Sequence, residues 1–343
     1  MAETIPSLVS TIIPVFNRPR MLREAVQSVL DQTYRPIEII IVDDGSTDGE
    51  TPTVAEQLVN KHPDIIRFRQ KENSGPGPTR EAGRLMARGE FIQYLDSDDL
   101  LRPRKFELMV QALRDNPDCG AAYGWICVNP FQQPPKEKPF KGSGETRQYL
   151  FPWILADRWW NTDCPLFRRS VTDAAGPWTD LRWSQDWEYD ARIGALGTKL
   201  FHVQDWVCDE RHHDEGRQTD FADWLQPERM RARKRLLELL LQHAETAGVP
   251  ATSEYRSHFT RWVFATARQC AAAGLAEESR VCLDLAVRSA GDCDVVRSGF
   301  RGFRILCGLV GTRNAGRLTL WLEKIKRPGR HTLQQTFARD LEP

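Results

Sequence analysis

The sequence feature that most limits the fold is a short apolar run that ends in a group of acids. Residues Phe91–Leu95 are rich in strand-forming side chains, and Asp96, Ser97, Asp98 and Asp99 follow at once. A bounded apolar run of this length predicts a buried strand, and open α/β sheets bind ligands just beyond such strand ends. Two residues apart, Asp96 and Asp98 can face one site, where carboxylates favour Mg2+ or Mn2+. The alternative is a solvated turn that caps the next helix.

Strands and helices alternate along the N-terminal part of the chain. Apolar, β-branched runs predict strands, and apolar residues at helical spacing predict helices. Strands are expected over residues 8–16, 37–42, 65–69, 91–95 and 119–125, and helices over 19–30, 51–61, 79–88 and 103–114. This order predicts right-handed crossovers and an α/β fold with a mainly parallel sheet flanked by helices.

A second acidic pair follows the strand expected over residues 37–42. Asp43 and Asp44 come directly before Gly45 and Ser46, a sequence that would by itself be a turn with a helix cap. Because the carboxyl ends of parallel strands meet at one edge, this pair is expected beside the acids of residues 96–99. The chain has no G-x-G-x-x-G after its first strand and no G-x-x-x-x-G-K-[ST], so a nucleotide would need another way to hold its phosphates.

Composition bounds the possible partners and the compartment. The 343 residues hold 47 basic and 47 acidic side chains, so no net charge points to nucleic acid. The eight cysteines are scattered without metal-site or disulfide spacing, which favours a reducing cytoplasm. The first ten residues lack the pattern of a signal peptide, and no apolar run approaches the ~20 residues of a membrane span. We therefore expect a soluble, cytoplasmic protein that can still touch a membrane.

Several segments resemble one enzyme family when they are taken together. In order, they are TIIPVFNRPRMLREAVQSVLDQTY, EIIIVDDGSTDG, ENSGPGPTREAGRLMARGEFIQYLDSDD, QDWEYDARIGALG and ERHHDEG. They resemble the family 2 glycosyltransferases over about residues 5 to 220. The resemblance implies the Rossmann-like GT-A fold and an inverting hexosyl- or N-acetylhexosaminyl-transferase. It also implies a nucleoside diphosphate sugar as donor, UDP above all, a divalent metal, a glycan or lipid-linked glycan as acceptor, and a role in cell envelope polysaccharide biosynthesis.

The resemblance also assigns site residues. Asp98 would hold the metal, with His213 as a metal or diphosphate contact, whereas Asp99 is an extra acid with no assigned role. A surface pair of histidines at 212 and 213 is the alternative. Either Asp43 or Asp44 would bind the base. The nucleotide-sugar pocket as a whole would comprise Pro14, Phe16, Asn17, Asp43, Asp44, Asn73, Arg80, Asp96 and Ser97.

Asp186 is the candidate catalytic base of the second half. Transfer from a nucleoside diphosphate sugar needs one base, which takes the proton of the attacking hydroxyl group. The family usually has Glu-Asp at this place, and the chain has Gln185-Asp186 instead, so the second acid is kept. The alternative is that Asp186 caps a helix or pairs with Arg182 or Arg192.

Tryptophans gather around this acid. Seven of the eleven lie between residues 153 and 206, and flat aromatic faces suit the C–H faces of sugars. Trp183 and Trp187, which flank Asp186, are the candidates for an acceptor pocket. The alternative for each tryptophan is ordinary core.

Near residue 221 the predicted structure changes from alternating strands and helices to helices alone. Helical spacing and glycine stops predict helices over residues 227–247, 253–273 and 275–290. Residues 297–330 hold nine basic residues and one acid between apolar side chains, a pattern typical of a segment at the inner face of a membrane or of a packed helix with a basic solvent face. We expect a catalytic domain over 1–220 and a helical domain over 221–343.

Two functions of different classes remain open. The first is the metal-dependent glycosyltransferase. The second is a non-catalytic module that binds nucleotide sugars or glycans on the same fold. Intact Asp98, Asp186 and Arg80 favour the enzyme, because a binding module has no need of a base.

Overall fold

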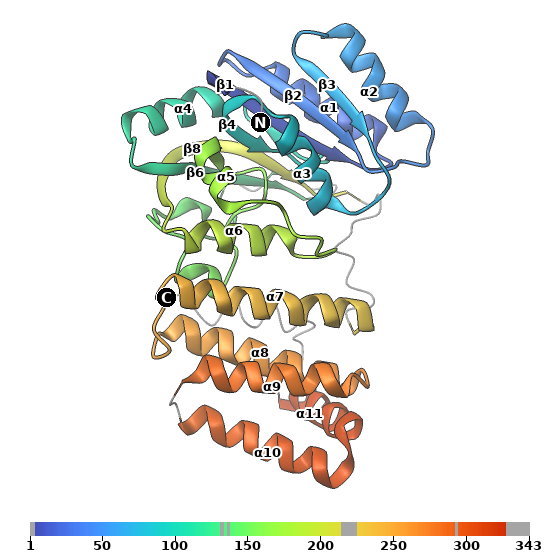
Figure 1. The fold of residues 1–343 in the computed structure, drawn as a ribbon, viewed down its shortest axis with the longest axis vertical. Helices are drawn as coiled ribbons and strands as arrows, with labels where there is room; N and C mark the ends of the chain where they lie inside the picture. Colours follow the sequence, from blue (N-terminus) through green and yellow to red (C-terminus); the bar gives the residue numbers. More distant parts are fainter. Residues whose placement is uncertain (1–3, 131–133, 136–137, 214–224, 292–293, 327–343) are drawn as a thin grey trace. The chain divides into compact units, whose positions relative to one another are not determined.

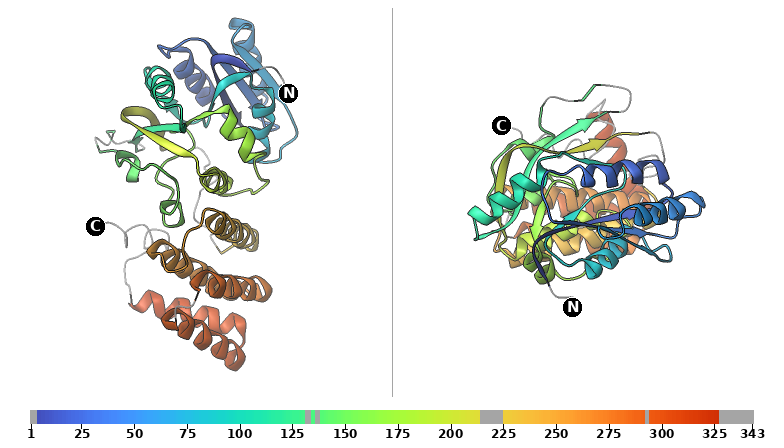
Figure 2. Two further views of the ribbon diagram at one scale, coloured as in Figure 1. Left: turned by 60° about the vertical axis from the view of Figure 1, so that its left-hand side comes forward. Right: turned by 90° about the horizontal axis from the view of Figure 1, so that it is seen from above.

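The computed structural model describes residues 4–130, 134–135, 138–213, 225–291 and 294–326, in two compact units (Figures 1 and 2). The first unit comprises residues 1–150 and 159–215, and the second comprises residues 151–158 and 216–343. The domain boundary expected at residue 220 lies in 214–224, outside the described residues. No helix in the described ranges combines the length and apolar character needed to cross a bilayer.

The first unit alternates strands and helices, as expected. In chain order it contains β1 (Ile5–Val15), α1 (Pro19–Leu30), β2 (Ile37–Asp43), α2 (Glu50–Lys61), β3 (Ile66–Gln70), α3 (Pro76–Met86), β4 (Gly89–Tyr94), β5 (Leu100–Leu101), α4 (Lys105–Asp115), β6 (Cys119–Asn129), η1 (Lys141–Gly144), β7 (Leu166–Arg168), α5 (Arg169–Ala175), α6 (Gln185–Ala195) and β8 (Lys199–Arg211). The predicted strands and helices of residues 8–125 are present, with ends that differ by a few residues.

The strands form one eight-stranded sheet in the order β3-β2-β1-β4-β7-β6-β8-β5. The half that holds β3, β2, β1 and β4 is parallel throughout, with Ile13 beside Ile41 and Val9 beside Phe91. The two inner strands β2 and β4 and most of β1 are buried, as parallel strands covered on both faces must be, whereas the edge strand β3 is mostly half-buried or exposed. The carboxyl ends of β2 and β4 therefore lie at the same edge of the sheet.

The other half of the sheet adds short antiparallel pairs to the expected, mainly parallel sheet. The three-residue strand β7 runs antiparallel to both β4 and β6, and β5 runs antiparallel to β8, whereas β6 and β8 are parallel. The sheet as a whole is mixed. Since β7 is antiparallel to β4, the residues that precede β7 lie at the same edge as those that follow β4.

Helix α3 packs closely on the parallel half. A Cβ atom on Gly83 would lie 2.4 Å from Cγ2 of Ile12, so only glycine lets the helix approach β1 this closely. The helix begins at Pro76, three residues before the predicted start, because Pro76 suits the first turn and Gly75 precedes it with a positive φ angle of 89°.

The Pro-, Lys- and Gly-rich connection that follows β6 is only partly irregular where it is described. Residues 131–133 and 136–137 lie outside the described ranges. Lys141–Gly144 forms the short 3-10 helix η1, and Ser143 is buried against β6, where its hydroxyl accepts the backbone N–H of Ile126 at 3.2 Å.

The second unit is helical, as predicted. Its described elements are η2 (Trp153–Leu155), α7 (Pro227–Thr246), α8 (Glu254–Ala272), α9 (Ala276–Ala290), α10 (Asp294–Val310) and α11 (Thr312–Lys326). The basic segment predicted over residues 297–330 corresponds to most of α10 and α11, and its last residues, 327–330, lie outside the described ranges. Each of these helices packs on its neighbours through small or apolar side chains.

Candidate functional site

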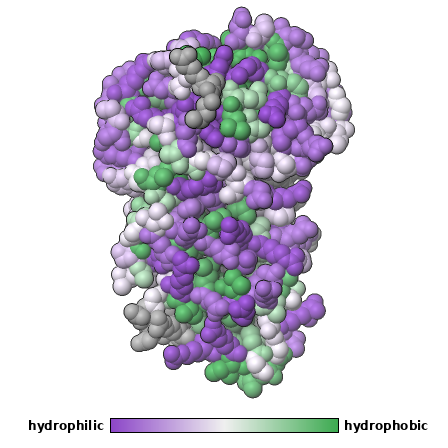
Figure 3. All heavy atoms as spheres, viewed as in Figure 1, coloured by the Kyte–Doolittle hydropathy of each residue, from purple (hydrophilic) through white to green (hydrophobic). Residues whose placement is uncertain are grey.

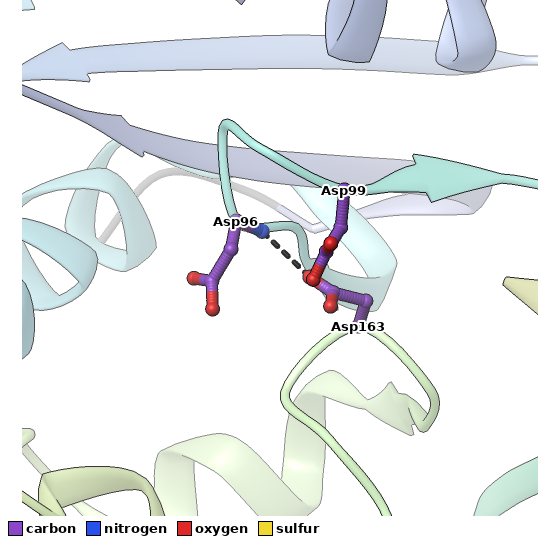
Figure 4. Close-up of side chains that lie close together, drawn as sticks. All are labelled: Asp96, Asp99 and Asp163. Carbon is purple, nitrogen blue, oxygen red and sulfur yellow. Dashed lines mark hydrogen bonds between the residues drawn. The ribbon is translucent and has the colours of Figure 1, made fainter. Parts of the chain in front are cut away.

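Three carboxylates meet at the edge of the sheet where β4 ends. Asp96, Asp99 and Asp163 each offer an oxygen atom within 4.8 Å of the others. Figure 4 shows the carboxylates of Asp99 and Asp163 directed toward each other, with the side chain of Asp96 to one side. Asp96 and Asp99 were singled out from the sequence; Asp163, which precedes β7, was not. Among the described residues, this is the acidic group whose geometry could hold a cation.

The position of Asp163 is fixed by the end of β4 and by a buried lysine. Its Oδ1 accepts the backbone N–H of Asp96 at 2.6 Å, and its backbone oxygen accepts the side-chain amide of Gln93 at 2.8 Å. Lys105 is fully buried and donates to the backbone oxygens of Asp163 and Cys164. These contacts hold the loop before β7 against the end of β4, so the cluster is part of the folded core of the site.

The cluster holds uncompensated negative charge. Burial and repulsion from Asp96 raise the pKa of Asp163 to about 7. Burial and the charge of Asp163 likewise raise the pKa of Asp99 well above its usual value, although Asp99 accepts the backbone N–H of Arg211 at 2.8 Å. Oδ2 of Asp163 is buried without a hydrogen-bond partner among the described residues. Buried carboxylates of this kind are stabilised by a cation, and their oxygens are the ligands that Mg2+ and Mn2+ prefer. The residues therefore fit a divalent cation.

Asp98, the predicted metal ligand, lies outside this cluster and has two cationic or polar partners. Its Oδ2 is 2.6 Å from Nη1 of Arg18 and 3.0 Å from Nε2 of His213. Burial opposes ionisation, but the hydrogen bond from His213 and the charge of Arg18 lower the pKa of Asp98 to about 2. The structure thus brings together the predicted pair Asp98 and His213, beside the three-carboxylate cluster and not within it.

Arg80 is the buried cation of the site. Its guanidinium forms an ion pair with Asp96 and lies 5.0 Å from the ring centroid of Trp178. Burial would lower the pKa of Arg80, but the charges of Asp96, Asp186 and Asp163 raise it. Nε and Nη1 of Arg80 have no hydrogen-bond partner in the described part of the chain. These free donors beside an acidic cluster could bind an anionic group of a ligand.

The charge that Asp186 exerts on Arg80 places the candidate base beside the cluster. Asp186 is half-buried in the first turn of α6, at the positive end of the helix dipole. Gly77 of α3 comes so close to the segment before α6 that a Cβ atom there would lie 2.1 Å from the backbone oxygen of Thr179. This close packing of α3 holds the start of α6 near Arg80, which also belongs to α3.

Two residues close to Asp186 in sequence differ in their contacts. Arg192, considered above as a partner for Asp186, pairs with Glu188 at 2.6 Å and donates to the backbone oxygens of Ala175 and Pro177. Gln185, which replaces the family's first acid, is buried, and its Oε1 has no hydrogen-bond partner among the described residues.

The acidic pair after β2 is engaged within the protein. Both carboxylates are buried. Asp43 accepts hydrogen bonds from the hydroxyl and backbone N–H of Ser46 and from the amide of Gln70. The donors to Asp44 are Lys71 Nζ at 2.8 Å, the backbone N–H groups of Ser74 and Gly75 at 2.9 Å each, and the Thr79 hydroxyl at 2.8 Å. These contacts tie the loop after β3 to the end of β2.

The other residues predicted for the nucleotide-sugar pocket lie around this edge in different states of burial. Pro14 is buried in β1 opposite Val42, whereas Phe16 is 43% exposed. Asn17 has a left-handed backbone (φ 52°), and its Oδ1 accepts the backbone N–H of Thr47 at 2.7 Å. The remaining two are Asn73, which donates to the backbone oxygen of Asp44 at 2.9 Å, and the buried Ser97.

The tryptophans near Asp186 divide into core and surface. Trp159 and Trp160 are fully buried, and Trp178 is stacked on Tyr189 with ring centroids 4.0 Å apart. Trp183 and Trp187 are half-buried on either side of Asp186. The structure thus places Trp159, Trp160 and Trp178 in the core and leaves the two candidate acceptor residues partly exposed.

Asp163 is the site residue that sequence reasoning missed. It precedes a strand of only three residues, Leu166–Arg168, which has too few residues to show a period. In the sequence it appears only as an acid near a short apolar run. That run would place the acid at this edge of the sheet only if it formed a strand antiparallel to β4.

Residues 10–174 match the family model described as glycosyl transferase family 2. The chain is 40% identical over 143 residues to an uncharacterized glycosyltransferase of Rickettsia prowazekii, which covers 38% of this chain and 43% of that protein. It is 32% identical over 178 residues to the putative glycosyltransferase EpsH of Bacillus subtilis, which covers 48% of each chain. The chain thus spans less than half the length of these curated relatives.

Solved structures resemble this fold at low sequence identity. Staphylococcus aureus TarS 1-349 in complex with UDP-GlcNAc superposes with a TM-score of 0.58 at 14% identity and covers 86% of this chain and 91% of its own. The mannosyltransferase PcManGT of Pyrobaculum calidifontis, in complex with GDP-Man and Mn2+, gives 0.51 at 18% identity, with 92% and 86% covered. These likenesses confirm the expected GT-A fold.

Proposed function

We propose that this chain, whose residues 10–174 match the model of glycosyl transferase family 2, transfers a sugar from a nucleoside diphosphate sugar to a hydroxyl group with inversion at the anomeric carbon. The proposed donor is a UDP-linked hexose or N-acetylhexosamine. The proposed acceptor is a glycan or a lipid-linked glycan of a cell envelope polysaccharide. The likeness to one structure with UDP-GlcNAc and to another with GDP-Man supports a nucleotide sugar as donor.

One observation carries the proposal: the buried Arg80 lies within the electrostatic reach of Asp96, Asp163 and Asp186 together. The first turn of α6, the end of β4 and the loop before β7 therefore converge on one place. A candidate base, a group of oxygen ligands and a cation with unpaired donors are the groups that sugar transfer from a diphosphate requires.

Asp186 acts in this proposal as the single base. Its carboxylate accepts the proton of the acceptor hydroxyl as the oxygen attacks the anomeric carbon, and no second acid is needed because the leaving group is a diphosphate. The half-buried rings of Trp183 and Trp187 would orient the acceptor sugar through its C–H faces. The free donors of Arg80 would bind a phosphate oxygen of the donor.

Two neighbouring sets of residues could hold the divalent cation, Mn2+ or Mg2+. The family resemblance assigns Asp98 and His213, which are hydrogen-bonded to each other. The geometry favours Asp96, Asp99 and Asp163, because Arg80 pairs with Asp96 alone and no ion pair of Asp99 or Asp163 occurs among the described residues, while Asp98 already pairs with Arg18. When bound, the cation would neutralise the charge of the departing diphosphate.

The nucleotide would lie along the loops after β1, β2 and β3. The exposed ring of Phe16 could contact the base, next to Pro14 and Asn17. Asp43 and Asp44 would shape this pocket through the loop that they hold, together with Asn73, and Ser97 would line it near the sugar. All seven cysteines in the described ranges are free, which supports the proposal of a cytoplasmic enzyme.

Release of nucleoside diphosphate from a panel of UDP- and GDP-sugars, with and without Mn2+, tests the proposal. We expect Mn2+-dependent release from one donor class, and we expect Asp186→Asn to lower turnover by about 10²–10⁴-fold while donor binding persists. Asp180→Asn is a matched control, because Asp180 is a surface carboxylate in the same segment that no part of the proposal uses.

Three results would contradict the proposal. Donor binding without turnover over a broad set of acceptors, unaffected by Asp186→Asn, would support the binding module instead. A product that retained the donor's anomeric configuration would remove Asp186 from its role as base. Equal losses in Asp180→Asn and Asp186→Asn would show that the segment matters for folding only.

A further inference from the structure

Helices α10 and α11 of the second unit carry apolar side chains on their solvent side. Leu309 is 77% exposed, Ile305 64% and Trp321 57%. We define the α10–α11 face as the exposed apolar residues of the two helices: Ile305, Leu309, Val310, Leu318, Trp321, Leu322 and Ile325. Figure 3 shows apolar atoms gathered at the end of the second unit that α10 forms. Apolar patches of this kind usually mark an interaction surface.

This face is not the side through which the helices join the unit. Phe300 and Phe303 of α10 are buried, and their rings lie 4.7 Å and 5.9 Å from the ring of Phe264 in α8. Helix α11 packs on α8 through small residues: a Cβ atom on Gly316 would lie 2.3 Å from the backbone nitrogen of Ala272. Each helix therefore has one face that completes the core and a second apolar face that the fold does not use.

The charges around the face are almost all positive. Arg301, Arg304, Arg313 and Arg317 are exposed on the same two helices. Glu323 is the single acid between residues 299 and 326, and it forms an ion pair with Arg268 of α8. Arg304 pairs with Asp284 at 2.5 Å. The surroundings of the face thus complement a negatively charged surface.

We propose that the α10–α11 face binds the surface of a membrane that contains anionic phospholipids. Exposed apolar residues with a tryptophan, bordered by arginines, are the pattern of helices that lie in the interface of a bilayer. The apolar side chains enter the acyl boundary, and the arginines contact the phosphate groups of the lipids. The strong exposure of Ile305 and Leu309 also suits a lipid bilayer, because its acyl region can accommodate protruding side chains.

A second copy of the chain is a poorer occupant. In a two-fold dimer the same surface meets itself. Arg301, Arg313 and Arg317 of one copy would then approach those of the other, and the single acid between residues 299 and 326, Glu323, already pairs with Arg268. The repulsion opposes that arrangement, whereas an anionic lipid surface relieves it.

Co-sedimentation of the full chain with lipid vesicles tests the proposal. We expect binding to vesicles of phosphatidylcholine with phosphatidylglycerol, weak binding to phosphatidylcholine alone, and loss of binding at high salt. Leu309→Asp should weaken binding by about 10-fold or more, because a charge would enter the acyl boundary. Arg301→Gln should weaken it by roughly 5-fold, the value expected for one basic residue near an anionic surface.

The control is Leu85→Asp, the same chemical change at a leucine of α3 that is 64% exposed in the first unit. It should leave vesicle binding unchanged, and thermal unfolding should show that all three variants are folded. Equal binding to both kinds of vesicle, no binding, an equal loss in Leu85→Asp, or a dimer in light scattering that Leu309→Asp dissociates would each overturn the proposal. The measurement needs no donor or acceptor, so its failure is independent of the proposed transferase activity.

Discussion

Two acidic loops follow β2 and β4 in this protein, and the two strands lie on either side of β1. In the first loop the carboxylate of Asp44 accepts hydrogen bonds from a lysine, two backbone N–H groups and a threonine. In the second loop the carboxylate of Asp99 faces that of Asp163, which comes from the loop before β7, and Oδ2 of Asp163 has no partner in the described part of the chain.

The difference separates an acid that builds the fold from one that is available to a ligand. A buried carboxylate with several donors stabilises the loop that supplies them, whereas buried carboxylates that face one another destabilise the folded state until a proton or a cation arrives. In sequence both loops read as a strand followed by paired aspartates. Four substitutions or titrations can test whether the structural difference has these consequences.

The largest effect is expected for Asp99→Asn in the second loop. If the cluster holds the catalytic cation, turnover should fall by about 10²–10⁴-fold, because the cation stabilises the transition state by several kcal/mol. The increase in melting temperature on addition of Mn2+ should also disappear. The metal-free variant should be at least as stable as the parent protein, since the substitution removes a repelling charge.

Asp98→Asn provides the comparison for this experiment. If the cation depends on Asp98 and His213 instead, Asp98→Asn will abolish the response to Mn2+ and Asp99→Asn will keep it. That outcome would show that the carboxylate cluster is structural, and that the contrast between the two loops is one of stability alone.

The second effect is a dependence of stability on pH in the metal-free protein. The pKa of Asp163 is about 7 in the folded protein, against about 4 for an aspartate in an unfolded chain. Between these values the folded state binds more protons, so the free energy of unfolding should decrease as the pH rises from about 4 to about 7 and level off above it. Asp98, with a pKa of about 2, acts in the opposite direction and only below about pH 4.

Urea unfolding in the presence of EDTA, repeated over this pH range, measures the slope. Asp163→Asn should reduce it, and Mn2+ should remove it because a bound cation favours the ionised carboxylates. A slope that is the same in the variant and the parent protein would show that Asp163 does not titrate in this window.

The parallel half of the sheet could be predicted from the sequence, but the second acidic loop could be predicted only in part. Long apolar runs such as Ile37–Asp43 can be recognised as buried strands, because burial on both faces requires almost every side chain to be apolar. Asp96 and Asp99 follow such a strand directly. Their partner Asp163 comes from a loop 64 residues beyond Asp99, next to a strand too short to show a period. Its position depends on the antiparallel direction of β7 and on the contacts of Lys105, and no local sequence pattern predicts either.

Hydrogen bonds explain why the role of the first loop could not be predicted either. A carboxylate that contacts a ligand and one that stabilises a loop can occur in the same local sequence pattern, a strand followed by paired aspartates. The difference lies in Lys71, Ser74, Gly75 and Thr79, about thirty residues further along the chain, which supply donors to Asp44 only after folding. The position of Asp186 likewise depends on a contact that local sequence does not indicate. Asp186 lies near Arg80 because Gly77 closely approaches the segment before α6.

A moderate effect on stability is expected for Asp44→Asn in the first loop. The substitution keeps the shape of the side chain but removes the charge that Lys71 and the backbone N–H groups bind, so unfolding free energy should fall by about 1–3 kcal/mol. Urea unfolding measures this loss, and the response of the variant to Mn2+ should match that of the parent protein. A loss of donor affinity with unchanged stability would instead show that Asp44 contacts the nucleotide directly.

The smallest effect should come from Lys71→Met, which separates charge from hydrogen bonding in the first loop. Nζ of Lys71 lies 2.8 Å from Oδ1 of Asp44, and both side chains are mostly buried. Asp44 keeps two backbone N–H donors and the Thr79 hydroxyl in the variant, so its carboxylate remains satisfied. We expect a loss of about 1 kcal/mol or less, measured by urea unfolding.

Losses in Lys71→Met and Asp44→Asn of equal size, with no further loss in the double variant, would mean that the ion pair alone holds the loop. The first loop would then depend on a compensating cation just as we propose for the second, and the two loops would differ only in whether the protein supplies that cation itself.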